Sequence, residues 1–502
     1  MPRFKEMPMP PSQTMLIGVS VEEALPKDSD VRLFGEVMDY VDYGYLVQGR
    51  SERGCPPYHP KVMVKVLTYA YSKGIRSSRR IEELLKIDVR FIWLSGGLKP
   101  DHNTIARFRK DNWETFEELF KDSVRLCGRA GLVLLNAVAV DGTKISAAAS
   151  RRQVYSQSKV DRQLEMVEKI LREAEEVDKA EDEIYGDGTF GQMPDHLKDP
   201  KARKEYLEKI AKQLREGDKK AVVATDPDSR VMKVGKGLGP AYNVQAAVDS
   251  ENQVVLAIKV VQEEDDHGEL PDMIEEVVAN TGAVPGVSLA DCGYVDEETL
   301  VWIEESKHDV LMPLQEPSRA RERNDLFDSR CFLADEKEDA LVCPAGRLLT
   351  YRGDCRCGSG TYRRYDARGC QNCSFYRQCV PTGKGSRRIR ASIVEEQRTK
   401  MRQRLQSHDG RILYDLRQQT VEPVFGQKKS NQGFARFAVW GLNGAKAESA
   451  LMFLAHNITK CATKAAHLVR LSLLQPVLPA ARIIGAQTRF VGRSKMRLVA
   501  AF

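Results

Sequence analysis

The first 130 residues place apolar side chains at the spacing of helices. HPKVMVKVLTYAYSKG repeats them three and four residues apart, and SSRRIEELLKI begins with a serine that can cap a helix. In KPDHNTIARFRK, Asp101 or Asn103 can cap a helix that carries Arg107, Arg109 and Lys110. These patterns predict an all-helical domain over residues 1–130. Its basic helix suits DNA binding, and an amphipathic helix with solvated arginines is the alternative.

Short apolar runs then indicate strands. LLNAVAV ends at Asp141-Gly142, a pattern typical of a buried strand that leads into a turn. AYNVQAAVD and NQVVLAIKVVQ meet at Ser250-Glu251 and predict an antiparallel hairpin. GVSLAD, which ends at Asp291, predicts another short strand. Helical patterns in LPDMIEEVVANTG and VDEETLVWIEES complete a mixed α/β sheet with helices on its faces.

Two regions interrupt this pattern. Residues 156–217 are highly charged, with apolar residues three and four apart, which predicts two long helices in a hairpin with a solvated outer face. A later region is rich in cysteine and basic residues. We therefore expect a helical N-terminal domain over 1–130, a core over 131–310 and 400–465, a helical hairpin over 151–220, a cysteine-rich insertion over 311–399, and a basic tail over 466–502.

Composition is that of a soluble globular protein, with 42% hydrophobic and 29% charged residues among 502. The net charge of +6 says little, but its distribution is uneven. Eleven basic residues face two acids between Cys343 and Arg390, and eight basic residues lie between Lys460 and Phe502 without an acid. Such blocks suit a polyanion, although a solvated basic face is the alternative.

The chain carries no pattern of a membrane or secreted protein. Its longest apolar run, GLVLLNAVAV, is about half the length of a membrane span. The segment MPRFKEMPMPPSQ lacks the apolar stretch of a secretory signal. We therefore expect a cytoplasmic protein whose eleven cysteines are thiols or metal ligands.

Three acids are candidates for a metal site. Asp141 and Asp291 end short apolar runs, and their carboxylates would share one sheet edge if the two strands are neighbours. Glu422, on a later helix, can complete a set of three oxygen ligands for one or two Mg²⁺ ions. The alternatives are a turn at Asp141 and a helix start at Glu422, which precedes Pro423. The acidic loop around His267 is expected to be solvated and receives no role.

Four motifs resemble, in this order, the DDE transposases of bacterial insertion sequences: VDGTKISAAAS, YNVQAAVD, LADCGY and VEPVFGQKKSNQGFARF. The helical N-terminal region resembles the domain that accompanies them. The resemblance covers roughly residues 30–460 and implies an RNase H-like fold with Asp141, Asp291 and Glu422 as catalytic acids. It also implies cleavage at the terminal inverted repeats with Mg²⁺ or Mn²⁺, attack of the freed 3′-hydroxyl on target DNA, and a homodimer on DNA.

The related transposases carry a Tyr-x2-Arg-x3-Glu-x6-Lys signature around the glutamate. Tyr414, Arg417, Glu422 and Lys429 fit it with one extra residue after Arg417. On an unbroken helix Lys429 lies within about 20° of Glu422, whereas Arg417 lies about 140° away. We therefore expect Lys429, more than Arg417 or Tyr414, to contact phosphate. The other predicted DNA contacts are Lys428, Arg436, Arg107 and Arg109.

The cysteine-rich region contains Cys370-x2-Cys373, the spacing of a zinc knuckle. Tetrahedral zinc needs two more ligands, and the related transposases carry a Cys-Pro before this pair and a further cysteine after it. Cys343 and Cys379 are therefore the first choice, with reduced thiols and no metal as the alternative. Two other cysteines compete for these places: Cys355 and Cys357.

Two other functions stay open. One is a catalytically silent DNA-binding regulator derived from a transposase, which the presence of all three acids disfavours. The other is an RNase H-fold nuclease that only hydrolyses DNA. The basic helical domain, the cysteine-rich insertion and the basic tail favour a protein that must hold two DNA ends.

Overall fold

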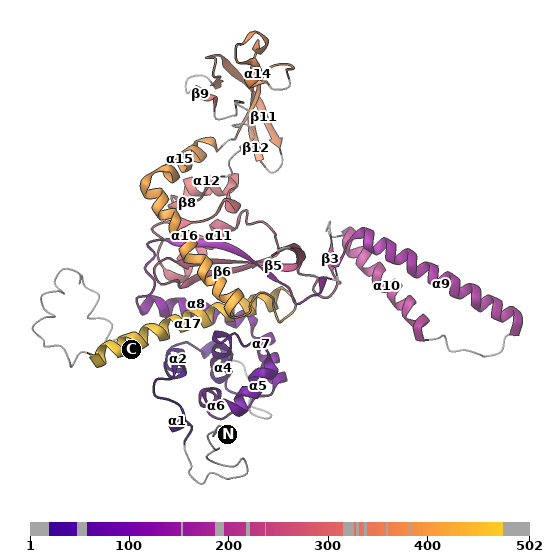
Figure 1. Cartoon of the computed structure of the whole chain (residues 1–502), viewed down its shortest axis with the longest axis vertical. Coiled ribbons are helices and arrows are strands. Elements are labelled where there is room, and N and C mark those ends of the chain that lie inside the picture. The colour runs from indigo at the N-terminus through magenta and orange to yellow at the C-terminus, as the bar shows by residue number, and fades with distance from the viewer. Residues whose placement is uncertain are drawn as a thin grey trace, which may run out of the picture. The chain divides into compact units, whose positions relative to one another are not determined.

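The chain divides into two compact units, one of residues 1–130 with 450–502 and one of residues 131–449 (Figure 1). No helix in the described part of the chain is long and apolar enough to cross a membrane. The computed structural model describes residues 20–47, 58–151, 154–185, 195–216, 221–235, 237–314, 326–327, 331–335, 339–357, 360–380, 383–392 and 394–474.

The first unit is helical, as predicted. Ser77 and Asp101 cap two of its helices by accepting hydrogen bonds from the backbone N–H groups of Arg80 and Thr104. Its last helix, α17, contacts α8 where Asn457 Nδ2 donates to Ser123 Oγ, 3.1 Å away. The helices are α1 Val21–Ala24, α2 Asp30–Asp39, α3 Gly44–Val47, α4 Pro60–Ser72, α5 Ser78–Ile87, α6 Val89–Ser95, α7 His102–Asp111, α8 Trp113–Arg129 and α17 Leu442–Leu474.

A six-stranded mixed sheet forms the centre of the second unit. Along the sheet the order is β4-β5-β1-β7-β8, and β6 also pairs with β5. The pairs β1–β5 and β5–β6 are antiparallel, whereas β1–β7 and β7–β8 are parallel. The predicted hairpin and the predicted strand before Asp291 are thereby confirmed. The strands are β1 Val138–Ser146, β4 Arg230–Val234, β5 Gly237–Asp249, β6 Val255–Val261, β7 Ser288–Leu289 and β8 Val310–Leu311.

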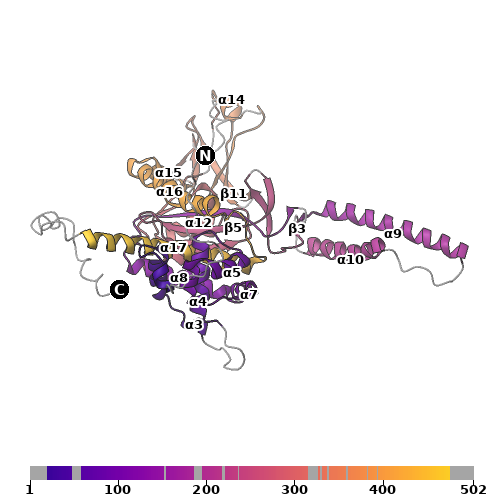
Figure 2. The ribbon, with the colours of Figure 1, turned by 60° about the horizontal axis from the view of Figure 1, so that its bottom comes forward.

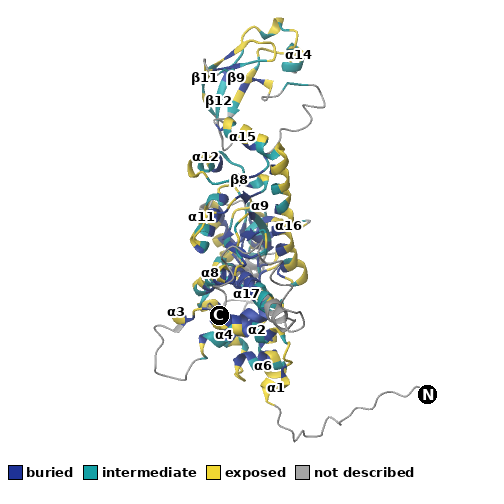
Figure 3. Cartoon of the chain, turned by 90° about the vertical axis from the view of Figure 1, so that its left-hand side faces the viewer, coloured by how far each residue is buried: buried dark blue, intermediate teal, exposed yellow. Residues whose placement is uncertain are grey.

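Helices flank this sheet, and its central strands are buried (Figure 3). Helix α11 packs on β6, and α16 packs on β1 and β5. This arrangement confirms the predicted mixed α/β sheet with helices on its faces. The helical elements are α11 Glu269–Thr281, η2 Cys292–Tyr294, α12 Glu297–Ser306, α15 Glu395–Gln406, α16 His408–Gly426 and the π-helix η5 Gln427–Asn431.

The two segments that were predicted to be insertions contain regular structure. Helices α9 and α10 lie side by side next to a two-stranded ribbon, and most of the predicted loop between them lies outside the described residues (Figure 2). The cysteine-rich region contains an antiparallel sheet, ordered β13-β12-β11-β10-β9, around Leu349 and Tyr365. Bounds are α9 Gln157–Tyr185, α10 Asp195–Glu216, β2 Val154–Tyr155, β3 Val222–Val223, β9 Leu333–Asp335, β10 Ala340–Val342, β11 Leu348–Cys357, β12 Gly360–Asp366, β13 Arg388–Ser392, η4 Cys370–Asn372 and α14 Tyr376–Cys379.

Two local expectations are corrected. Asp141-Gly142 forms no turn, because β5 pairs with β1 along its whole length and keeps these residues extended. Pro423 does not start a helix but lies inside α16, which begins after the capping residue Ser407. An internal proline frees the carbonyl four residues earlier. Here that carbonyl, of Gln419, accepts a hydrogen bond from Gln253 Nε2, 3.1 Å away.

The predicted basic tail lies partly outside the described residues. Helix α17 continues to Leu474, so the first residues assigned to the tail are helical. Residues 475–502 lie outside the described part of the chain.

Candidate active site

The register of two parallel strands brings the predicted aspartates together. Val138 of β1 pairs with Ser288 of β7, and Ala139 pairs with Leu289. Asp141 lies two residues after Ala139, within β1. Asp291 lies two residues after Leu289, just beyond the end of β7. β1 and β7 are therefore neighbours, which is the condition under which the two carboxylates were predicted to share a sheet edge.

Arg417 of α16 joins the two carboxylates. Its Nη2 atom lies 3.2 Å from Asp141 Oδ1 and 3.6 Å from Asp291 Oδ2. The side chain is buried because Arg417, Val421 and Val424 share the helix face that packs on the sheet. The sequence predicted that Arg417 lies away from the acids, because the angle around the helix was counted from Glu422 and came to about 140°. The structure corrects this: the face of Arg417 is the one that meets Asp141.

The electrostatics of this group favour an added cation. Burial raises the pKa of Asp141 to about 6, and the neighbouring charges of Asp291 and Asp266 act in the same direction. Arg417 and the Gly142 N–H, which donates to Asp141 Oδ1, oppose the shift. Asp291 Oδ1 likewise accepts from the Gly293 N–H at 2.7 Å. The carboxylates are thus held together despite burial and mutual repulsion, and such a set of oxygen donors suits a divalent metal ion.

Lys429 and Tyr414 also lie near this group. Lys429 Nζ donates to the carbonyl of Lys144 on β1, 2.7 Å away. Burial lowers the pKa of Lys429, and the charge of Asp141 opposes that shift. Tyr414 is half-buried, and its pKa is raised by burial, with Arg417 and Asp291 among the charges it senses. Both residues are close enough to the acid pair to feel its charge.

Glu422 is exposed on α16. Within the described residues, no hydrogen bond or ion pair joins it to Asp141 or Asp291. Its direction from the helix axis differs by about 140° from that of Arg417. The role of Glu422 as third acid therefore stays a prediction.

The remaining predicted DNA contacts differ in burial and in hydrogen bonding. Lys428 is 2% exposed and donates to Gln432 Oε1, and Arg109 is 7% exposed and donates to Tyr71 and Arg76. Such burial argues against a phosphate contact for either side chain. Arg436 is exposed but donates to the carbonyls of Ala147 and Ala149. Arg107 is exposed.

Sequence reasoning missed a third carboxylate at the site, that of Asp266. Asp266 Oδ1 accepts hydrogen bonds from Asn243 Nδ2 at 2.7 Å and Gln245 Nε2 at 2.5 Å. It belongs to the acidic loop around His267, which was expected to be solvated. The sequence of β5 contains a signal for such a partner: Asn243 and Gln245 are polar residues among the mostly apolar buried positions of this strand. Buried amides of this kind need hydrogen-bond partners.

Close packing around Gly293 gives a testable prediction. A Cβ at this position would lie 2.9 Å from Asp291 Oδ1 and 3.3 Å from Asp266 Oδ2. Gly293→Ala is therefore expected to displace the carboxylates and to lower the DNA cleavage that the sequence resemblance implies, with a small change in thermal unfolding. The control is Gly426→Ala in α16, where a Cβ meets no heavy atom within 4 Å. This change should keep activity and stabilise the chain by up to about 1 kcal/mol. Equal activity of both variants would contradict the packing argument.

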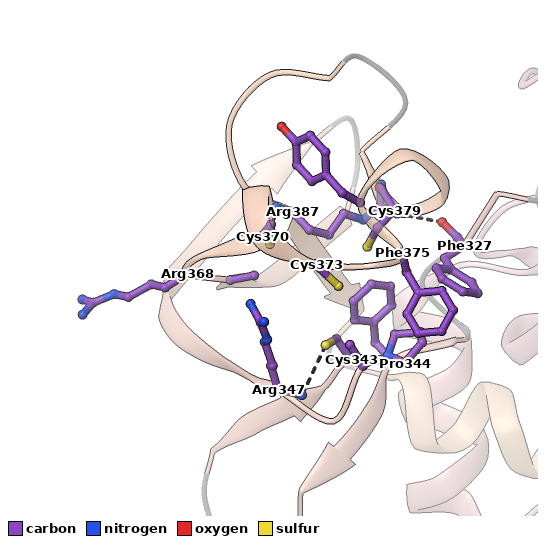
Figure 4. Close-up of a pocket in the computed structure, with 14 residues that line it drawn as sticks. Phe327, Cys343, Pro344, Arg347, Arg368, Cys370, Cys373, Phe375, Cys379 and Arg387 are labelled. Carbon is purple, nitrogen blue, oxygen red and sulfur yellow. Dashed lines mark hydrogen bonds between the residues drawn. The ribbon is translucent and has the colours of Figure 1, made fainter.

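Four cysteines surround one cavity in the cysteine-rich region (Figure 4). Backbone N–H groups donate to two of the sulfur atoms, from Arg347 to Cys343 Sγ and from Arg387 to Cys370 Sγ. Burial raises the pKa of the Cys379 thiol, and the other three cysteines are near enough to act in the same direction. The cysteines are Cys343, Cys370, Cys373 and Cys379.

The other two candidate ligands do not join this group. Cys355 is absent from the lining of the cavity, and the side chain of Cys357 lies outside the described residues. As placed, no three His, Cys, Asp or Glu side chains in the described ranges form a group that could hold a metal ion. The structure therefore shows neither a zinc site nor a complete magnesium site. At the acid pair, the Arg417 guanidinium lies against both carboxylates.

Comparison with known proteins defines the class of the chain. Residues 342–462 match the family model Transposase DDE domain, and residues 19–111 match Transposase domain (DUF772). No curated protein and no solved structure matches. Both matched segments are thus similar to transposase domains, which imply DNA binding and transposition, and DDE transposases in general use a divalent metal ion. Arg417, Glu422 and Lys429 lie inside the first match, whereas Asp141 and Asp291 lie outside it.

Proposed function

We propose that this protein is the transposase of a bacterial insertion sequence. It binds the terminal inverted repeats, cleaves phosphodiester bonds at the element ends and joins the freed 3′-hydroxyl groups to target DNA. The observation that carries this proposal is the pair Asp141 and Asp291, adjacent in the sheet and bridged by Arg417 from the matched DDE domain. The strand order, with an antiparallel hairpin on one side of β1 and parallel strands on the other, supports an RNase H-like core.

Asp141 and Asp291 are the residues that would hold the metal. When bound, Mg²⁺ or Mn²⁺ supplies activation of the attacking oxygen and stabilisation of the leaving one. The protein positions both carboxylates through the β1–β7 register and through the N–H groups of Gly142 and Gly293. Arg417 offsets part of the negative charge of the metal-free pair. We assign the third acid to Glu422, by resemblance to related transposases.

DNA would reach this site along basic surface. Lys429, which lies near Asp141, is the best placed of the predicted phosphate contacts. In the helical domain, the exposed Arg107 would contact phosphate. In the cysteine-rich sheet, the partly exposed Arg363 stacks over Tyr351 and pairs with Asp339, an ion pair that a DNA phosphate would have to replace. Such contacts position the DNA backbone without specifying sequence. Two element ends must be handled together, so we expect a homodimer on DNA in the cytoplasm.

The deciding experiment uses purified full-length protein and a labelled DNA fragment that carries one end of the element, with Mg²⁺ or Mn²⁺. A transposase cleaves at the element end and then joins the 3′ end to a second DNA. Cleavage without joining would favour a nuclease. Binding without cleavage would favour a silent regulator. Both outcomes would overturn the proposal.

The second part of the proposal is a structural zinc ion held by Cys343, Cys370, Cys373 and Cys379. Two short turns present these thiols: the Gly346 N–H donates to the Cys343 carbonyl, and the Cys373 N–H donates to that of Cys370. Backbone N–H groups aimed at Sγ atoms stabilise thiolates. Four thiolates are a donor set that zinc accepts in structural sites, and these four cysteines would hold the ion. The ion would stabilise a five-stranded sheet whose apolar core is small.

Zinc content tests this part separately from activity. The wild-type protein is expected to carry one zinc ion per chain by elemental mass spectrometry, and Cys373→Ser to lose most of it. Removal of zinc by a chelator should also lower the unfolding temperature. The matched control is Cys355→Ser, since Cys355 does not line the cavity. The assignment would be contradicted if the wild-type protein carried no zinc, or if both variants lost equal amounts of zinc.

A further inference from the structure

We infer that Asp266 is a further metal-binding carboxylate of the active site, held in place by Asn243 and Gln245. This inference rests on the proposed function, because it adds a ligand to the site formed by Asp141 and Asp291. It depends on the arrangement of side chains around two glycines: Gly142, next to Asp141, and Gly293, two residues after Asp291.

The carboxylate of Asp266 packs against the backbone next to each of the two aspartates, at Gly142 and at Gly293. A Cβ at Gly142, next to Asp141, would lie 2.5 Å from Asp266 Oδ1. A Cβ at Gly293 would lie 3.3 Å from Asp266 Oδ2 and 2.9 Å from Asp291 Oδ1. The carboxylate of Asp266 thus lies against the Cα atoms of Gly142 and Gly293, and only glycine leaves room for it there.

The orientation of Asp266 is fixed through a chain of buried hydrogen bonds. Tyr294, fully buried, donates its hydroxyl to Gln245 Oε1, so the amide of Gln245 turns its Nε2 toward Asp266 Oδ1. Asn243 Nδ2 donates to the same oxygen. With Oδ1 engaged twice, Oδ2 is the atom that faces Gly293 and Asp291. Ligating carboxylates are commonly held by such outer hydrogen bonds, which makes Asn243 and Gln245 positioning residues.

A buried oxygen without a partner points to a missing ligand at the same place. Asn243 is fully buried, and its Oδ1 accepts no hydrogen bond from any described residue. This oxygen would lie 3.0 Å from a Cβ at Gly142, beside Asp266 Oδ1. An orphan acceptor of this kind costs about 1–3 kcal/mol. A hydrated divalent cation removes the cost, because Mg²⁺ keeps several water molecules that can donate to such an oxygen.

The charge balance supports the same class of ligand. Asp141, Asp266 and Asp291 bring three carboxylates together, and among the described residues Arg417 is the cation that forms ion pairs with two of them, Asp141 and Asp291. Lys429, whose Nζ donates to the Lys144 carbonyl, adds a second positive charge near Asp141, so the three carboxylates still outnumber the two nearby cations. A hard divalent ion with oxygen ligands satisfies this excess. Such an ion would share Asp141 and Asp291 with the Arg417 guanidinium, which now lies against both carboxylates.

Metal binding to the full-length protein without DNA tests the inference. Mn²⁺ is titrated by electron paramagnetic resonance into wild type, Asp266→Asn and the neighbouring exposed control Asp265→Asn. We expect Asp266→Asn to bind Mn²⁺ at least about 10-fold more weakly. Asp265→Asn should match wild type. Thermal unfolding without metal shows whether each variant is folded, and Gln245→Ala provides a second variant, with weaker Mn²⁺ binding expected.

The outcomes separate this inference from the proposed function. If Asp266→Asn binds Mn²⁺ within twofold of wild type while Asp141→Asn loses binding, Asp266 is no ligand and the active site stands. A lowered unfolding temperature at unchanged Mn²⁺ affinity would give Asp266 a purely structural role and would also overturn the inference. If wild type binds Mn²⁺ through Asp266 but neither cleaves nor joins DNA, the proposed function fails and the metal site remains.

Discussion

Asp141→Asn and Asp291→Asn proteins are expected to bind element-end DNA like wild type and to lose strand cleavage by about 10³-fold or more. Each change removes a carboxylate from the pair that would hold the metal, and metal ions contribute several kcal/mol to such reactions. Every 1.4 kcal/mol corresponds to a factor of ten in rate. The rate of cleavage of labelled DNA, with binding measured in parallel, checks this expectation.

The matched control for these variants is Asp415→Asn, an exposed aspartate on α16. It should keep wild-type cleavage, because it does not belong to the acid pair. Glu422→Gln in the same series tests the predicted third acid. Cleavage by Asp141→Asn at the wild-type rate would remove the basis of the proposed site.

Arg417→Gln is expected to destabilise the metal-free protein by about 3 kcal/mol. The change leaves Asp141 and Asp291 together and partly buried without their shared cation, and loss of one partner from a buried ion pair typically costs about 3–5 kcal/mol. We take the low end because Asp291 retains 34% exposure of its side chain. Mg²⁺ should restore part of the lost stability, since it would replace the missing positive charge.

Urea denaturation with and without Mg²⁺ measures this effect. Arg411→Gln is the control, because Arg411 is exposed on the same helix. It should change the free energy of unfolding by less than about 0.5 kcal/mol. Equal stability of the two variants would show that the Arg417 bridge contributes nothing. A loss that Mg²⁺ leaves unchanged would separate Arg417 from the metal site.

Much of the fold was predictable because local patterns determine it. Alternating and continuous apolar runs marked β1, β5 and β6, and Gly282 ended the helix after the hairpin as expected. Asp141 and Asp291 could be found because each follows a short apolar run. The parallel pairing of β1 with β7 then brings them together.

The parts that sequence reasoning missed depend on contacts between distant segments. Arg417 was placed away from the acids, because nothing local shows which face of α16 packs on the sheet. Asp266 lies in a loop of acids that looks solvated, and only the register of β5 brings Asn243 and Gln245 to it. Pro423 fits inside a helix because Gln253, from another segment, satisfies the freed carbonyl.

The most direct measurement of the central claim locates the metal in the protein itself. Fe²⁺ replaces Mg²⁺ in the full-length, DNA-bound protein, ascorbate and peroxide generate hydroxyl radicals at the ion, and mass spectrometry maps the backbone cuts. We predict cuts next to Asp141 and Asp291 that excess Mg²⁺ suppresses. Cuts confined to other segments, or cuts that Mg²⁺ does not suppress, would contradict a catalytic metal at this sheet edge.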